Sequence, residues 1–87
     1  KVVYQLKQLG LQVVASTEKT KTHSYEIDFT LPTAIIMGSE EDGVSTKLLA
    51  ESDAKAKIPM VGSIASLNVS VAAGIMLYEA SRQRLTE

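Results

Sequence analysis

The chain has 87 residues, 45% of them hydrophobic and 22% charged, which predicts one small folded domain and excludes a disordered chain. It has no cysteine and one histidine, so a disulfide framework and a protein-built zinc site are excluded. The net charge of −1 provides no overall basic field for nucleic acids, and the longest mostly apolar stretch, residues 69–78, is much shorter than the roughly 20 residues of a membrane span. We therefore expect a cytoplasmic domain that binds neither metal nor membrane.

The first elements expected along the chain are a helix and a buried strand. Apolar residues recur at helical spacing over residues 2–9, and Gly10 follows as a typical C-cap, so this segment is expected to form an amphipathic helix. The apolar, β-branched run of residues 11–15 then predicts a buried strand, reached by a tight turn. Together they form one αβ unit.

A polar loop is expected next. Residues 16–24 show no apolar pattern, and His23 is expected to be an exposed residue without a catalytic role. Apolar and polar residues then alternate from Tyr25 to Phe29. This period of two predicts an edge strand or an extended segment, which Pro32 ends.

The middle of the chain carries a second αβ unit. Residues 34–37 form a compact apolar run closed by Gly38, the pattern of a central parallel strand whose end opens toward a ligand site. Ser45 is placed to cap a following helix that carries Leu48 and Leu49 toward the core.

The last third of the chain predicts a strand, a loop and a long helix. Residues 54–60 resemble a strand with a proline near its end, residues 62–66 form a loop of small residues, and the helix begins at Leu67. The helix is apolar on so many sides that we expect it to be buried. The order of elements predicts an α/β domain with a largely parallel sheet, and the small number of strands predicts a partial domain that lacks N-terminal strands.

Two segments could carry chemistry. The first, residues 35–45, joins a strand, a glycine turn and an acidic cluster to a helix start. By itself it is weak evidence, because Gly38 could be a structural turn and the acidic residues could favour the helix N-terminus through its dipole. The segment matches neither a phosphate-binding loop nor a dinucleotide-binding fingerprint.

The second segment, residues 58–84, places a glycine-serine loop and the triplet Ser66-Leu67-Asn68 before a helix of small residues. On spacing alone, Ser66 could be the N-cap and Asn68 a residue of the first turn. A buried asparagine at the head of an apolar helix must find hydrogen-bond partners, so capping and a ligand site both remain open for Asn68.

These two segments together resemble the second and third sequence motifs of the SpoU/TrmH family of RNA ribose 2′-O-methyltransferases, and the run SLNVSVA with its upstream IPM is the most specific part. The resemblance covers the whole chain as the C-terminal part of the catalytic domain. It implies a parallel-sheet α/β fold with a deep C-terminal trefoil knot, S-adenosylmethionine as the cofactor, and methyl transfer to a ribose 2′-hydroxyl of RNA, ribosomal RNA more than transfer RNA. It also implies a homodimer formed through the knot region.

The resemblance also assigns the site residues. The positions that match its cofactor contacts are Gly38, Ile58, Met60 and Leu67. The positions that match its catalytic residues are Glu40, Ser66 and Asn68. It implies no metal ligand.

One departure from the family pattern is large. The first motif of the family, with an asparagine and the arginine assigned to activating the 2′-hydroxyl, has no counterpart in the 87 residues, so the chain alone is expected to be inactive. Arg82 and Arg84 lie too far along the last helix to replace that arginine, and we expect them to face solvent or an interface. A non-catalytic module that binds and dimerises, and a knotted enzyme acting on a base, remain the alternatives.

Overall fold

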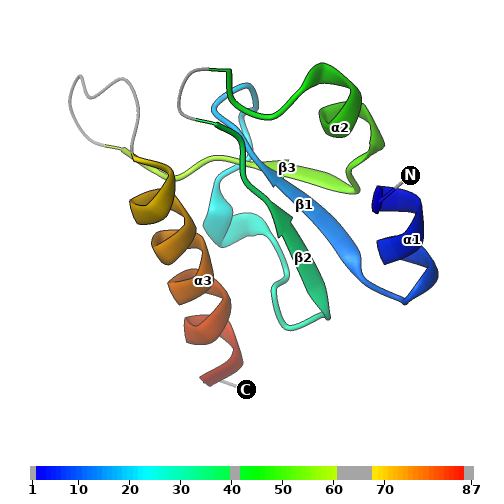
Figure 1. The fold of residues 1–87 in the computed structure, drawn as a ribbon. Helices are drawn as coiled ribbons and strands as arrows, with labels where there is room; N and C mark the ends of the chain where they lie inside the picture. The colour runs from blue at the N-terminus through cyan, green and yellow to red at the C-terminus, as the bar shows by residue number, and fades with distance from the viewer. Residues whose placement is uncertain (1, 40–41, 61–67, 86–87) are drawn as a thin grey trace.

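The computed structural model describes residues 2–39, 42–60 and 68–85. At its centre is a sheet of three parallel strands in the order β2-β1-β3 (Figure 1). The strands are β1 (Gln12–Ser16), β2 (Thr33–Ile36) and β3 (Ala54–Ala56). The helices are α1 (Val2–Gln8), the 3-10 turn η1 (Ser24–Glu26), α2 (Thr46–Glu51) and α3 (Val69–Leu85). The parallel α/β fold predicted from the sequence is confirmed.

Apolar residues on both faces of β1 divide the core into two clusters. Val14 lies in one cluster and its neighbour Ala15 in the other, because successive side chains of a strand point to opposite faces. The first cluster packs beneath α3 and contains Val14, Ile27, Phe29, Ala56 and Met76. The second packs beneath α2 and contains Ala15, Val44 and Leu49. The helices thus cover both faces of β1.

The N-terminal αβ unit has the form predicted from its sequence. After α1, Gly10 adopts a φ of 87°, the left-handed conformation that glycine enters without steric cost and that commonly ends helices. The chain then enters β1, in which Val13, Val14 and Ala15 are fully buried. The predicted helix and buried strand are confirmed.

The expectation that β2 is a central strand is wrong for the part of the sheet that the structure describes. There β1 is central: it pairs with β2 on one side, where Val14 lies opposite Ile35, and with β3 on the other, where Val14 lies opposite Ala54. All four residues of β2 keep intermediate exposure, whereas three of the five in β1 are buried. Within the described part of the sheet, β2 is therefore an edge strand.

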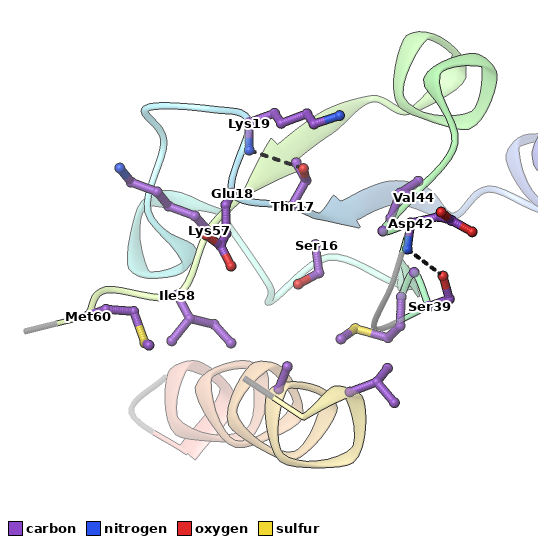
Figure 2. Close-up of a pocket in the computed structure, with 15 residues that line it drawn as sticks. Ser16, Thr17, Glu18, Lys19, Ser39, Asp42, Val44, Lys57, Ile58 and Met60 are labelled. Atoms are coloured by element: carbon purple, nitrogen blue, oxygen red, sulfur yellow. Dashed lines mark hydrogen bonds between the residues drawn. The ribbon is translucent and has the colours of Figure 1, made fainter. Parts of the chain in front are cut away.

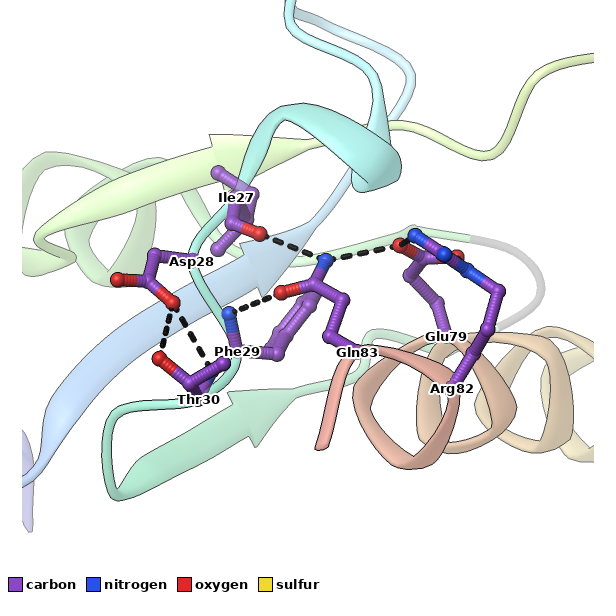
Figure 3. Close-up of polar contacts among 7 residues, drawn as sticks. All are labelled: Ile27, Asp28, Phe29, Thr30, Glu79, Arg82 and Gln83. Carbon is purple, nitrogen blue, oxygen red and sulfur yellow. Dashed lines mark hydrogen bonds and ion pairs between the residues drawn. The ribbon is translucent and has the colours of Figure 1, made fainter. Parts of the chain in front are cut away.

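The alternation from Tyr25 to Phe29 reflects contact with α3 and not strand pairing. Ile27 and Phe29 are buried against Met76, and the segment forms no strand of the sheet. Its backbone is hydrogen-bonded by a helix side chain instead: the Phe29 amide donates to Gln83 Oε1 at 2.7 Å, and Gln83 Nε2 donates to the Ile27 carbonyl at 2.8 Å (Figure 3). The predicted edge strand is therefore wrong, and the extended alternative holds only from Ile27 on, because Tyr25 and Glu26 belong to the 3-10 turn η1.

The last turns of α3 are joined to this segment by further polar contacts. Arg84 Nε donates to the Phe29 carbonyl at 2.9 Å, so this arginine helps to bind the segment to the helix. Glu79 accepts hydrogen bonds from Arg82 at 2.7 Å and from Gln83 at 2.8 Å, which orients the Gln83 amide. The hydrogen bond from Arg82 lowers the pKa of the Glu79 carboxyl, so this acceptor is ionised at neutral pH.

Of the predicted strand over residues 54–60, only the first three residues form β3. Lys57 pairs with the loop before η1, since its amide donates to the Thr22 carbonyl at 2.9 Å and its carbonyl accepts from the Ser24 amide at 2.7 Å. Pro59, two residues on, has no amide hydrogen for a ladder. The chain after Ala56 therefore leaves β1 and holds the loop of residues 17–24 in place.

The prediction that the last helix is buried is wrong for this chain. Met76 is the one fully buried residue among those that the structure describes in α3, while Val71, Ile75 and Tyr78 are 51%, 37% and 70% exposed. These three follow one another at helical spacing, so they form one apolar stripe on the outward side. The predicted helix start at Leu67 is two residues too early, because α3 begins at Val69 and Asn68 precedes the helix. The predicted loop of residues 62–66 lies outside the described residues. No helix within the described ranges is long and apolar enough to cross a membrane.

Candidate functional site

A pocket of about 320 Å³ opens where the three parallel strands end (Figure 2). Ser16 closes β1, Met37 and Gly38 follow β2, and Lys57 and Ile58 follow β3. The other lining residues are Thr17, Glu18, Lys19, Ser39, Asp42, Gly43, Val44, Met60, Val69 and Ala72. Ligands of open parallel sheets bind outside the carboxyl ends of the strands, so this is the expected place for a small molecule.

The pocket has an apolar side and a polar side. Ile58 and Met60, which follow β3, line the pocket together with Val69 and Ala72 from the start of α3. On the opposite side lie the loop after β1 and Lys57, which bring the charged groups of Glu18, Lys19 and Lys57 to the rim. Such a pocket can hold a flat apolar group at one end and charged or hydrogen-bonding groups at the other.

The turn after β2 is built by close backbone contact. Gly43 adopts a φ of 69° and donates its amide hydrogen to the Ser39 carbonyl at 2.9 Å, while the Asp42 amide donates to Ser39 Oγ at 3.0 Å. This folds the chain back over Gly38 so tightly that a Cβ atom there would overlap the Gly43 carbonyl carbon and the Val44 nitrogen. Gly38 is therefore required by the chain's own turn, and it also lines the pocket.

The helix after this turn begins as the sequence predicts. Ser45 is the N-cap of α2, and its side chain accepts a hydrogen bond from the Leu48 amide at 3.2 Å. The preceding Val44 is buried in the cluster with Leu49, which anchors the turn to the sheet. The cap and the buried valine thus fix one wall of the pocket.

Asn68 is the N-cap of α3 and not a residue of its first turn. Its Oδ1 accepts hydrogen bonds from the Ser70 amide at 2.8 Å and the Val71 amide at 3.4 Å, and its carbonyl accepts from the Ala72 amide at 2.9 Å. The side chain is held at the head of the helix, directly before Val69 of the pocket wall. Asn68 itself does not line the pocket.

The structure brings together three of the four cofactor positions expected from the family resemblance. Gly38, Ile58 and Met60 come from two different strand ends and line the same pocket. Leu67, Glu40 and Ser66 lie outside the described residues, so their roles, like that of Asn68, stay predictions.

The loop after β1 was missed as part of the site. Ser16, Thr17, Glu18 and Lys19 line the pocket, yet this stretch looks like an ordinary solvated loop in the sequence. The available signal was its position directly after a buried parallel strand, because the carboxyl ends of parallel strands meet at one edge.

Within the described ranges, no three His, Cys, Asp or Glu residues are grouped as a metal ion would need.

Comparison with known proteins connects this pocket to a family. Residues 1–78 match the SpoU rRNA Methylase family. The chain belongs to that family. The resemblance noted in the sequence is thereby confirmed.

Relatives of known activity cover nearly the whole chain. It is 48% identical over 81 residues to the tRNA (guanosine(18)-2′-O)-methyltransferase of Thermus thermophilus, a match that covers 92% of this chain and 42% of that protein. It is 45% identical over 80 residues to the 23S rRNA (guanosine-2′-O-)-methyltransferase RlmB of Pseudomonas syringae, covering 92% of this chain and 32% of that protein. The chain thus spans less than half the length of these relatives.

Solved structures of the family superimpose closely on this fold. The TrmH/SpoU tRNA modifying enzyme of Aquifex aeolicus has a TM-score of 0.86 and 42% identity, over 98% of this chain and 44% of that one. The SpoU methyltransferase AviRb of Streptomyces viridochromogenes, solved in complex with AdoMet, has a TM-score of 0.86 and 35% identity, over 99% of this chain and 35% of that one.

Substitution of Gly38 tests the tight turn. Gly38→Ala is expected to lower stability by about 1–3 kcal/mol, because the added methyl group overlaps backbone atoms of Gly43 and Val44 that cannot rotate away. Gly74→Ala is the control, since nothing lies within 4 Å of a Cβ atom there and alanine is the better helix former. Thermal unfolding checks both variants, and equal stability of Gly38→Ala and the wild type would contradict the described turn.

Proposed function

We propose that this chain forms the S-adenosylmethionine pocket of an RNA ribose 2′-O-methyltransferase. The observation that carries the proposal is the pocket at the strand ends, where Gly38, Ile58 and Met60 meet as the family resemblance implies for the cofactor. The names of the relatives, which are 2′-O-methyltransferases of tRNA and of 23S rRNA, support the same reaction. The likeness to AviRb, which was solved with AdoMet, supports the same cofactor.

The pocket fits that cofactor in size and chemistry. Its volume of about 320 Å³ lies within the range of roughly 300–1,000 Å³ of small-molecule sites. The apolar side, which includes Ile58 and Ala72, suits the adenine ring, and the carboxylate of Glu18 at the polar side suits the ammonium and hydroxyl groups. Gly38 itself, held in its tight turn, belongs to the lining of the pocket.

When bound, S-adenosylmethionine supplies an electrophilic methyl group on its sulfonium sulfur. The remaining task is to align the ribose oxygen with that methyl group, and such alignment can contribute a large part of the rate. We assign this task to Asn68, at the head of α3, and to Ser66, with Glu40 orienting polar partners. The cap hydrogen bonds of Asn68 to Ser70 and Val71 support this, because they fix the position of its side chain. The family resemblance implies that the arginine of the first motif removes the hydroxyl proton, and this motif has no counterpart in the 87 residues.

The outward stripe of α3 supports a homodimer. Val71, Ile75 and Tyr78 expose apolar surface at helical spacing, the kind of surface that a self-complementary two-fold contact covers. We propose that a second copy packs there, and that the C-terminal segment forms the family's trefoil knot beside it. Because Val69 and Ala72 of the same helix line the pocket, the site would border the dimer interface.

We also propose a cytoplasmic RNA substrate. The relatives include methyltransferases of both transfer and ribosomal RNA, and the sequence-based expectation favours ribosomal RNA. Methylation of total RNA by the full-length protein, followed by mapping of the modified nucleotide, decides between the two. A protein that binds the cofactor and dimerises but methylates no RNA would instead be the non-catalytic module.

The proposed function predicts cofactor binding. The full-length protein is expected to bind S-adenosylmethionine and S-adenosylhomocysteine in calorimetry, and Ala72→Leu is expected to weaken binding tenfold or more by filling the apolar side of the pocket. Ala50→Leu adds the same atoms to an exposed position on α2 outside this pocket and should bind like the wild type. Absence of binding by the wild type would refute the cofactor assignment.

Two substitutions of Asn68 separate capping from catalysis. Asn68→Ala removes the cap and should cost about 1 kcal/mol of stability together with methylation activity. Asn68→Asp keeps an oxygen that accepts from the Ser70 amide, so stability should be retained while activity falls at least tenfold. Methylation rates and thermal unfolding are measured side by side. Full activity of Asn68→Asp would leave Asn68 with a capping role alone.

The proposed dimer predicts that a charge on the apolar stripe of α3 prevents dimer formation. Ile75→Glu places a carboxylate in the apolar stripe and should convert the protein to a monomer in analytical ultracentrifugation, since an unpaired charge in an interface core costs several kcal/mol. Thr46→Glu, at an exposed position in the first turn of α2, introduces the same charge elsewhere and should leave the dimer intact. An Ile75→Glu variant that stays dimeric would place the contact on another surface.

A further inference from the structure

A second functional surface lies beside the pocket, on the other side of Lys57. Lys57 lines the pocket, and its backbone also pairs with the loop that carries His23. The Lys57 amide donates to Thr22 and its carbonyl accepts from Ser24, so the loop is attached on both sides of His23. The pocket rim and this loop therefore form one continuous surface.

The loop presents a stacked aromatic pair. The rings of His23 and Tyr25 are stacked, with centroids 5.2 Å apart and an interplanar angle of 4°. Glu26 holds the histidine of the pair in place, because its carboxylate accepts a hydrogen bond from the His23 amide at 2.9 Å and lies 3.2 Å from His23 Nδ1. These hydrogen bonds lower the pKa of Glu26, so the carboxylate is ionised at neutral pH and remains an acceptor.

The stack is held firmly but is not covered. Tyr25 is 56% exposed, although Ser24 before it and Ile27 two residues after it are buried. An aromatic residue needed only for packing would bury most of its ring, because burial is the source of its stabilising effect. A rigid and exposed ring beside a ligand pocket is instead suited to stacking on another flat group.

Three lysines belong to this loop and the adjoining pocket rim. Lys21 is exposed two residues before His23, and Lys19 and Lys57 line the pocket, with side chains that extend from its rim in opposite directions in Figure 2. Among the described residues, none of these three lysines forms an ion pair. Their charges are therefore available for anionic groups, although the chain as a whole has a net charge of −1.

We propose that Lys19, Lys21, Lys57 and the His23–Tyr25 stack form a basic-aromatic patch that binds the single-stranded RNA next to the methylated nucleotide. The lysines contact phosphates, and Tyr25 stacks on a base. Phosphate contacts combined with aromatic stacking are the general means by which proteins hold unpaired RNA. The patch deepens the proposed function, since it assigns a place on this chain to the RNA that enters the pocket.

Binding measurements on the full-length protein test the patch. The probe is a fluorescein-labelled single-stranded oligoribonucleotide of mixed sequence, titrated at several salt concentrations. Tyr25→Ala is expected to weaken binding roughly tenfold, whereas Tyr25→Phe, which keeps the ring, should bind like the wild type. Lys21→Gln should weaken binding and reduce the slope of log K against log salt by about 0.7, the value for one phosphate contact on a single strand.

The controls separate this proposal from the proposed function. Lys47→Gln removes the same charge from the exposed start of α2 and should leave affinity and salt slope less affected than Lys21→Gln does. Affinity for S-adenosylmethionine should be unchanged in Tyr25→Ala, because Tyr25 does not line the pocket. If the wild-type protein methylates no RNA, the proposed function is wrong. The RNA affinities of the variants would still show whether the patch binds RNA.

Two results would overturn the patch. One is unchanged RNA affinity in both Tyr25→Ala and Lys21→Gln. The other is a loss of RNA affinity in Tyr25→Ala that is not specific to the ring. This is the case if Tyr25→Phe loses the same affinity, or if Tyr25→Ala also has a lower unfolding temperature and weaker cofactor binding. The stack would then have a structural role only.

Discussion

Parallel hydrogen bonding of β1 to both β2 and β3 aligns the carboxyl ends of three strands at one edge of the sheet. The chain leaves the sheet there three times, after Ser16, Ile36 and Ala56, and each exit contributes a wall of the pocket. This pairing depends on Val14 and Ala15, which are buried on opposite faces of β1. A polar residue at either position would separate a covering helix from the sheet, and the pocket would lose a wall.

Local signals in the sequence were enough for some of the elements. Gly10 ends α1 by adopting a positive φ, and Ser45 caps α2 through its own hydroxyl, so each boundary depends on a few adjacent residues. The candidate positions Gly38, Ile58 and Met60 came from the family resemblance and not from such signals. The structure adds a physical reason for the glycine, which is the backbone of the following turn.

Other features could not be predicted because they depend on residues far apart in the chain. The alternation at Ile27 and Phe29 is the same whether the partner is a strand or a helix, and the amide of Gln83 determines the outcome from 54 residues away. The sequence of the loop after β1 is typical of a solvated loop, but in the structure the backbone of Lys57 pairs with this loop. Its role in the pocket thus follows from tertiary pairing and not from its composition.

The composition of α3 is explained by two different surfaces on one helix. Ala72 and Met76 face the pocket and the core, while Val71 and Ile75, one residue before each of them, face outward. Adjacent residues on a helix point about 100° apart, so a helix with both surfaces apolar shows no amphipathic pattern in its sequence. Both surfaces move together when the helix moves. A partner that covers Val71 and Ile75 would therefore also hold Ala72 against the pocket, and cofactor binding and association would stabilise the same position of the helix.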